Sequence, residues 1–288
     1  MIETLYPPQF PFLLQNIHDP PRKLYVEGSL PPLTHKVLCV VGSRTPSSYG
    51  EEACKKLIAG LKGYDISIIS GLALGIDGIA HRAALEAGLH TVAFPGSGLD
   101  PKALHPKTHH RLANEILYAG GALVSEFDHL QHGTDWTFPK RNRLMSGISD
   151  ATLVIEARML SGSLITARDA MEQNRPLGVV PGSIFSELSE GPHSYLREGA
   201  TPVMSVDDIL GLLGLGMHEN GRTSLQPTLL LGLSEEEQKL VELLRIESRT
   251  IDELIATSGF AAREVNEMLS RLEIEGVVKE RNGRIFMA

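Results

Sequence analysis

The chain has 288 residues, of which 42% are hydrophobic and 22% are charged, and its formal net charge at pH 7 is -8. A chain of this length is expected to divide into about two domains with full hydrophobic cores. The negative charge argues against a protein that coats duplex DNA non-specifically, because such binding draws on a basic surface. Any nucleic-acid site must therefore be local.

The cysteines and the N-terminus bear on the cellular compartment. Only Cys39 and Cys54 occur, and Cys39 lies in an apolar run, so we expect no disulfide framework and a reducing cytoplasm. The first residues lack the basic and apolar regions of a signal peptide, and no run approaches the ~18 apolar residues of a membrane helix. The sequence predicts a cytosolic protein that makes no contact with a membrane.

The first 35 residues are rich in proline and are expected to pack on the following domain rather than fold alone. From residue 36 to 215, short β-branched runs alternate with helix-length stretches. The expected strands are Val37–Val41, Ile66–Ser70, Thr91–Phe94, Leu123–Ser125, Thr152–Ile155, Gly178–Val180 and Pro202–Met204. The expected helices include Gly50–Leu61, Asp77–Ala87, Lys107–Ala119 and Thr166–Gln173. This alternation, with strands apolar on both faces, predicts a doubly wound, mostly parallel α/β sheet.

Residues 216–231 have the composition of a linker, and residues 232–288 show a different pattern. Two capping boxes predict helix starts, and they are formed by Ser234 with Glu237 and by Thr250 with Glu253. A third helix is expected over Ala261–Glu275, followed by a hairpin around Asn282-Gly283. This order predicts a small winged helix-turn-helix domain.

The charge of the winged domain bears on its role. Residues 232–288 contain 12 Asp and Glu against 8 Lys and Arg, and the third helix is itself acidic. A recognition helix in a major groove meets phosphates on both sides, so this acidity disfavours duplex binding. We interpret the domain as a site of protein contact or dimer support, with duplex binding as the alternative.

Two cationic segments carry the functional signal. Gly42-Ser43-Arg44 follows the strand that ends at Val41, and N–H groups beside a guanidinium at that end of a parallel strand are typical of anion binding. A salt bridge from Arg44 to Asp77 or Glu126 is the alternative. The segment Phe138–Arg143 combines three cations, an amide and a ring, which suits single-stranded nucleic acid. Arg44 and Lys140 are expected at loop positions.

Glycine turns follow several of the expected strands. They are Ser70–Asp77, Gly96-Ser97-Gly98, and Ser161-Gly162-Ser163 with Thr166. Each is typical of a tight turn as well as of phosphate contact, and their position at one edge favours an extended anion-binding rim. The Ser70–Asp77 turn matches neither a P-loop nor the dinucleotide fingerprint, and the acid that binds the NAD ribose is missing there. We therefore expect no cofactor.

Metal binding and catalysis are not indicated. His105 and His109 lie four residues apart with His110 beside them, but no cysteine or carboxylate cluster accompanies them, so we expect them to line the polar rim rather than bind a metal. No nucleophile and base can be paired from spacing, and Glu126 and Asp135 are too isolated for acid–base chemistry. The sequence predicts a binding protein rather than an enzyme.

Five motifs in chain order resemble those of the DNA-processing protein A family (DprA, also called Smf). They are Gly42-Ser43-Arg44, Ser70–Asp77, Phe138–Arg143, Ser161–Ala167 and Val180-Pro181-Gly182. The resemblance covers Tyr6 to Leu213 and implies an extended Rossmann-like domain without an established catalytic activity. It also implies a homodimer that binds single-stranded DNA and loads RecA recombinase onto incoming DNA in natural transformation, with single-strand-binding protein as a further candidate partner. Many members carry a C-terminal winged helix, to which residues 232–288 are similar.

Together, the residues and the resemblance suggest which side chains bind DNA. Phosphates are assigned to Arg44, Lys140, Arg141 and Arg143, donors to Gly42, Ser43, Ser161, Gly162, Ser163 and Thr166, and base stacking to Phe138, with Lys107 and Asn142 in the same site. The chain departs from the family at His109 and His193, where asparagine is usual, which puts the fine chemistry of the pocket in question.

Two rival functions remain. One is a nucleotide phosphoribohydrolase of the lysine-decarboxylase-like group, whose glycine loop is partly matched by Pro95-Gly96-Ser97-Gly98. The other is a winged-helix transcription regulator with a ligand-sensing domain, which the acidic third helix disfavours.

Overall fold

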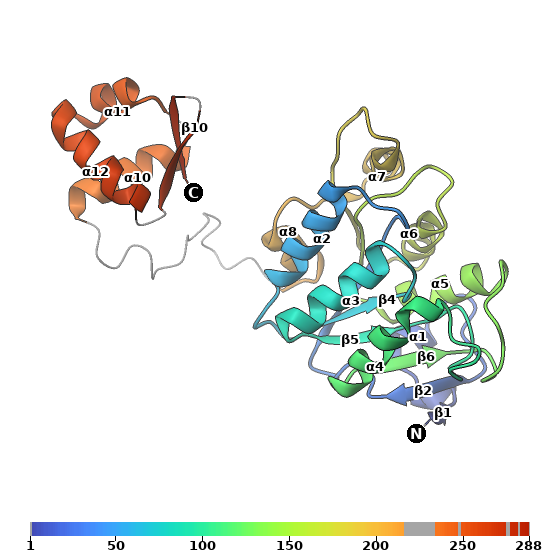
Figure 1. Cartoon of the computed structure of the whole chain (residues 1–288). Helices are drawn as coiled ribbons and strands as arrows, with labels where there is room; N and C mark the ends of the chain where they lie inside the picture. Colours follow the sequence, from blue (N-terminus) through green and yellow to red (C-terminus); the bar gives the residue numbers. More distant parts are fainter. Residues whose placement is uncertain (1, 216–233, 247–248, 275–276, 282, 288) are drawn as a thin grey trace. The chain divides into compact units, whose positions relative to one another are not determined.

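The computed structural model describes residues 2–215, 234–246, 249–274, 277–281 and 283–287 (Figure 1). The chain divides into two compact units, Met1–Met217 and His218–Ala288. The linker expected at residues 216–231 lies outside the described residues.

The frame of the first unit is a nine-stranded sheet. The strands are β1 Ile2–Leu5, β2 Leu24–Gly28, β3 Lys36–Val41, β4 Ile66–Ser70, β5 His90–Ala93, β6 Ala122–Ser125, β7 Ala151–Val154, β8 Leu177–Val179 and β9 Thr201–Pro202. They lie in the order β1-β2-β6-β5-β4-β3-β7-β8-β9, and all pairs from β6 to β9 in that order are parallel. The expected doubly wound, mostly parallel sheet is confirmed.

Helices cover both faces of this sheet (Figure 1). On one face lie α2 Ser48–Ala59, α3 Ile76–Ala87, α4 His110–Tyr118 and α8 Val206–Leu212, and on the other lie α1 Phe12–Gln15, α5 Thr137–Ile148, α6 Ser163–Glu172 and α7 Glu187–Arg197. Short 3-10 turns lie at Pro7–Gln9 and Lys107–His109. In β3, Leu38 and Val40 pack under the first set of helices, whereas Cys39 and Val41 pack under the second. A strand buried on both faces requires an unbroken apolar run, as the sequence has here.

The order of strands reverses between β3 and β7. From β3 the chain proceeds through β4, β5 and β6 on one side, and from β7 it proceeds through β8 and β9 on the other. The connections after these two neighbouring strands lead to helices on opposite faces, α2 and α6. Such a divergence leaves a crevice outside the carboxyl ends of the strands, which is where open α/β sheets bind ligands.

The proline-rich lead-in packs on the sheet domain, and it also supplies two strands that the sequence analysis did not name. Its two ends are strands: β2 pairs antiparallel with β6, and β1 pairs antiparallel with β2. The intervening segment with α1 packs on a sheet face. Leu24 and Val26 of β2 are buried, while Tyr25 and Glu27 are more exposed. This period-two alternation was present in the sequence and is typical of a strand with one solvated face.

The segment Phe138–Arg143 is helical, so the expectation of a loop position for Lys140 is wrong. Helix α5 begins at Thr137, and Pro139 lies in its first turn. Proline is tolerated there because the N–H groups of the first turn have no partner within the helix. Two further helices, α7 and α8, were not among those that the sequence analysis listed. Gly191 and Pro192 lie inside α7.

The second unit has the expected winged-helix elements. They are α10 Glu235–Ile246, α11 Ile251–Ser258, α12 Ala262–Ile274, β10 Val278–Arg281 and β11 Arg284–Met287. Both capping boxes form, with Ser234 and Glu237 exchanging hydrogen bonds at 2.8 and 3.2 Å, and Thr250 and Glu253 at 2.9 and 3.2 Å. The unit has its own apolar core, built from α10, α11, α12 and the hairpin.

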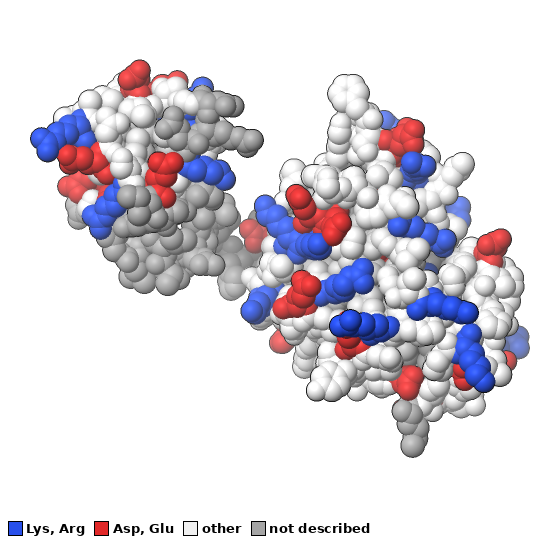
Figure 2. All heavy atoms as spheres, in the orientation of Figure 1, with Lys and Arg blue, Asp and Glu red and all other residues white. Residues whose placement is uncertain are grey.

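The distribution of surface charge and the character of the helices test two expectations, a local cationic site and the absence of a membrane-spanning helix. On the face of the first unit in Figure 2, Lys and Arg side chains are interspersed with Asp and Glu over α2 and α3. This mixture agrees with the net charge of -8 and with a local rather than extended cationic site. Within the described ranges, no helix combines the length and apolar character needed to cross a bilayer.

Candidate nucleic-acid interface

A pocket of about 480 Å³ opens at the crevice beside the ends of β3 and β7. Its lining is Val41, Gly42, Ser43, Arg44, Ala73, Asp77, Asp135, Phe138, Pro139, Arg141, Asn142, Met145, Arg158, Leu160, Ser161, Gly162, Ser163, Ile165 and Thr166. Ten of the thirteen residues proposed for DNA binding are in this lining. The other three, Lys107, Lys140 and Arg143, lie outside it. The structure therefore brings segments distant in the sequence to one cavity.

Arg44 is an exposed cation of this pocket. Its guanidinium carbon lies 5.4 Å from the centroid of the Phe138 ring, within the range of a cation–π contact. Among the described residues it forms no ion pair with Asp77 or Glu126, so the alternative salt bridge is not present. Because a ring face rather than a carboxylate holds the guanidinium, its N–H donors are available to an anion.

The N-terminus of α6 forms another part of the wall. Gly162 is its N-cap, and no side chain caps the helix, although the Ser163 N–H reaches the Ser161 hydroxyl at 3.4 Å. The Thr166 hydroxyl oxygen is buried and has no hydrogen-bond partner among the described residues. The first-turn N–H groups of Ser163, Leu164 and Ile165 already donate to the Ser161 hydroxyl and to the main-chain oxygens of Ser161 and Gly162. The helix dipole and the hydroxyls of this wall, among them that of Thr166, are what favour a phosphate here.

Arg141 lines the pocket but is occupied inside the protein. Its residue is 5% exposed, and its guanidinium donates to the main-chain oxygens of Gly71, at 2.7 Å, and of Phe94. Burial lowers the pKa of Arg141 to about 10, against the opposing effect of the nearby Asp77 carboxylate. Burial likewise raises the pKa of Asp77 above its usual value. Arg141 thus ties α5 to the turns after β4 and β5 rather than standing free for a ligand.

The first two glycine turns do not contribute to an anion rim. The N–H groups of Gly71 and Ala73 point at the Asp77 carboxylate, at 3.1 and 3.4 Å, so the turn after β4 has an internal anion. At Gly96, a Cβ would lie 2.2 Å from the Phe138 ring, so this turn is covered by α5. The expected extended rim is thereby reduced to the turns after β3 and β7.

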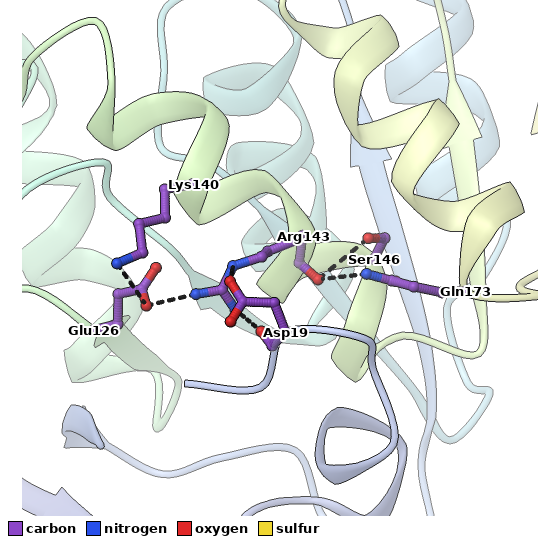
Figure 3. A network of polar contacts seen from close by, with 6 residues as sticks. All are labelled: Asp19, Glu126, Lys140, Arg143, Ser146 and Gln173. Atoms are coloured by element: carbon purple, nitrogen blue, oxygen red, sulfur yellow. Dashed lines mark hydrogen bonds and ion pairs between the residues drawn. The ribbon is translucent and has the colours of Figure 1, made fainter. Parts of the chain in front are cut away.

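Arg143 belongs to a separate ion-pair network (Figure 3). Its guanidinium lies 2.6 Å from the Glu126 carboxylate and 3.3 Å from that of Asp19, and Lys140 approaches the same Glu126 oxygen at 3.8 Å. Burial raises the pKa of Glu126, while Arg143 opposes that shift. Glu126 is therefore a partner of two cations rather than isolated, and Arg143 anchors the lead-in segment to α5.

The histidines are divided between structural and peripheral positions. His109 is buried and its Nδ1 lies 2.8 Å from the Leu72 main-chain oxygen, and His110 contacts the Leu104 oxygen at 3.0 Å. His105 instead packs against the Phe138 ring, with centroids 5.7 Å apart. Burial and the neighbouring Arg44 lower the pKa of His105. Within the described parts of the chain, no group of three His, Cys, Asp or Glu side chains could hold a metal ion.

Two residues at the site, Arg158 and Glu156, were not identified from the sequence, and Asp135 was named there only as an isolated carboxylate. Arg158 lines the pocket and pairs with Glu187 of α7 at 3.4 Å, and Asp135 places a negative charge in the lining. Glu156 lies beneath the turn after β3 and is 3% exposed. Both Glu156 and Arg158 follow the apolar run Thr152–Ile155. Their position after a predicted strand could have marked them as site residues.

Comparison with known proteins places this arrangement in a family. The sequence matches the DNA recombination-mediator protein A family over residues 2–214 and the DprA winged helix domain over residues 225–284. The chain belongs to the DNA recombination-mediator protein A family. The resemblance to DprA and Smf proteins, and the winged-helix assignment of the second unit, are confirmed.

Curated relatives carry names of the same family. "Protein Smf" of Escherichia coli is 45% identical over 74% of this chain and 55% of its own length. "DNA processing protein DprA" of Streptococcus pneumoniae is 41% identical over 70% of each chain. The match therefore spans little more than half of the E. coli relative.

Two solved structures share the fold of the first unit. The structure of DNA processing protein A from Streptococcus pneumoniae superposes with a TM-score of 0.68 at 38% identity, over 73% of this chain and 74% of that one. A second structure, of DNA processing protein A from Helicobacter pylori, is described as showing that protein's single-stranded DNA binding mode. It superposes with a TM-score of 0.65 at 28% identity, over 76% of this chain and 98% of that one.

Proposed function

We propose that this chain binds single-stranded DNA in the pocket between the ends of β3 and β7. The observation that carries the proposal is the meeting of two anion-seeking elements in one cavity, the Gly42–Arg44 turn and the α6 N-terminus. The related H. pylori protein is described by its title as binding single-stranded DNA, which supports the same ligand class here.

The pocket suits an unpaired strand better than a duplex. A cavity of about 480 Å³ can take one nucleotide unit, and only a single strand can turn a base or phosphate into it without breaking base pairs. The flat guanidinium of Arg44, held over the Phe138 ring, offers a surface on which a base can stack as well as N–H donors for a phosphate.

The small number of exposed cations in the pocket limits the electrostatic contribution to DNA affinity. The exposed cations of the lining are Arg44 and Arg158, and Arg158 also pairs with Glu187. If these two contact phosphates, the logarithm of the affinity should fall with the logarithm of the salt concentration with a slope of about -1.4, at about -0.7 for each contact with a single strand. Lys107, Lys140 and Arg143 would add to the slope only if the strand extends beyond the pocket.

We further propose that the protein acts in the cytoplasm, in DNA recombination and natural transformation, as a homodimer that loads RecA, and that it is not an enzyme. The family supports the process. The highly exposed Ile184 and Phe185, on the loop before α7, offer an apolar surface for protein contact. Against the phosphoribohydrolase alternative, the Gly96 turn is buried, packs against the Phe138 ring and is not part of the pocket lining.

Binding to fluorescent oligo-dT, measured by anisotropy, tests the proposal. Arg44→Ala should weaken binding by about tenfold to a hundredfold, the effect of removing a charged hydrogen bond. Lys62→Ala is the matched control, because Lys62 is an exposed cation at the opposite edge of the sheet, just before β4. Wild-type affinity in Arg44→Ala would refute the site. Adenine release from AMP would favour the phosphoribohydrolase instead.

A further inference from the structure

Glu156 is a buried carboxylate behind the candidate pocket, just after β7. Its two carboxylate oxygens accept hydrogen bonds from the Ser47 hydroxyl at 2.6 Å and from the Ser47 N–H at 2.9 Å. Its main-chain oxygen accepts the Ser43 N–H at 2.6 Å. One residue therefore holds both ends of the segment Ser43–Ser47, and Arg44 lies between them.

The groups around the Glu156 carboxylate accommodate its charge and its size. Ser47 is the N-cap of α2, where the helix dipole and free N–H groups favour a negative charge. Gly50, in the first turn of α2, lies so close that a Cβ there would be 2.3 Å from a Glu156 oxygen. Glycine at this position leaves room for the carboxylate. A buried charge is tolerated only when it is hydrogen-bonded in this way.

The side chain of Arg44 has no comparable anchor. Its described interaction is the cation–π contact with Phe138, and no hydrogen bond from its guanidinium is made to the residues that the structure describes. Its position therefore depends on the conformation of the Ser43–Ser47 segment. That segment is fixed on the other side by the Ser43 oxygen, which accepts the Ile76 N–H at 3.0 Å.

We infer that Glu156 is a positioning residue for Arg44. Its carboxylate fixes the segment Ser43–Ser47 so that the guanidinium stands over Phe138 with its donors toward the pocket. This inference rests on the proposed binding of single-stranded DNA. It predicts an energetic coupling between two residues that do not touch through their side chains, because the effect of Glu156 on DNA passes through Arg44.

A double-mutant cycle on the full chain tests the coupling, with oligo-dT affinity as the measurement. Glu156→Gln keeps the size of the side chain but removes the negative charge that accepts from both Ser47 donors. It should weaken binding by about fivefold or more in the wild-type background and by less than about twofold in the Arg44→Ala background. Asp150→Asn is the matched control, because Asp150 also accepts a main-chain N–H, that of Val37, but at the opposite end of β3.

The outcomes separate this inference from the proposed function. If Arg44→Ala binds as the wild type does, the proposed site fails and the inference fails with it. If Arg44→Ala weakens binding while Glu156→Gln has no effect, or has the same effect in both backgrounds, only the positioning role is overturned. Should Glu156→Gln not fold, Gly50→Ala disturbs the same carboxylate by steric contact and should show the same coupling to Arg44. Equal losses from Gly50→Ala in both backgrounds would also overturn it.

Discussion

Replacing Arg141 by methionine should destabilise the first unit rather than weaken DNA binding selectively. The change keeps most of the side-chain volume but leaves the buried Asp77 carboxylate without its neighbouring cation, and leaves the oxygens of Gly71 and Phe94 without a donor. Breaking a buried charge pair by removing one member costs about 3–5 kcal/mol. For a unit of this size each kcal/mol lowers Tm by about 2–4 °C, so we expect a decrease of about 6–20 °C.

Thermal unfolding followed by circular dichroism measures this change, with Arg44→Ala as the comparison. Arg44 is exposed, so its replacement should alter stability by less than about 0.5 kcal/mol. An unchanged Tm in Arg141→Met, together with a loss of oligo-dT affinity as large as that of Arg44→Ala, would refute the reasoning. Arg141 would then be a DNA ligand and not a structural tie.

Three other predictions concern acid stability, pocket charge and the winged domain. Burial lowers the pKa of His81 to about 3, so its stabilising contribution is complete above pH 6.5 and is lost as the pH falls toward 3. Urea unfolding at pH 5 should show a loss of about 2 kcal/mol that His81→Gln lacks. Asp135→Asn should raise oligo-dT affinity by about twofold to fivefold, because an exposed negative charge leaves the lining. Isolated residues 218–288 should shift neither duplex nor single strand in a mobility assay, since Arg263 and Arg271 already pair with Glu267 and Glu237.

The fold could be predicted from sequence largely because its strands are buried on both faces. Such strands give unbroken apolar runs, as at Val37–Val41, and the expected and observed bounds differ by a few residues at most. The strands β1 and β2, which lie at one end of the sheet, were missed because the prolines near them suggested irregular structure. The alternation of Leu24, Tyr25 and Val26 was the signal that could have corrected it.

The sequence predicted most of the residues that line the candidate site, but not the role of each cation. Lys140, Arg141 and Arg143 form one cluster in the sequence, yet a helix turns about 100° per residue and sends them in different directions. Arg141 enters the core, whereas Arg143 pairs with Glu126. Which face of α5 meets the sheet depends on tertiary packing, and no local pattern fixes it. Glu156 acts through a partner 109 residues away, Ser47, which spacing alone does not reveal.

Hydrogen exchange of the full chain with and without oligo-dT tests the central claim most directly. A strand bound between the ends of β3 and β7 should slow exchange of the N–H groups in Gly42–Arg44 and Ser161–Ser163. Residues 62–65, at the opposite edge of the sheet, should exchange at the same rate in both samples, and a duplex of the same length should give much weaker protection. Protection confined to the second unit, or equal protection by the duplex, would contradict the account.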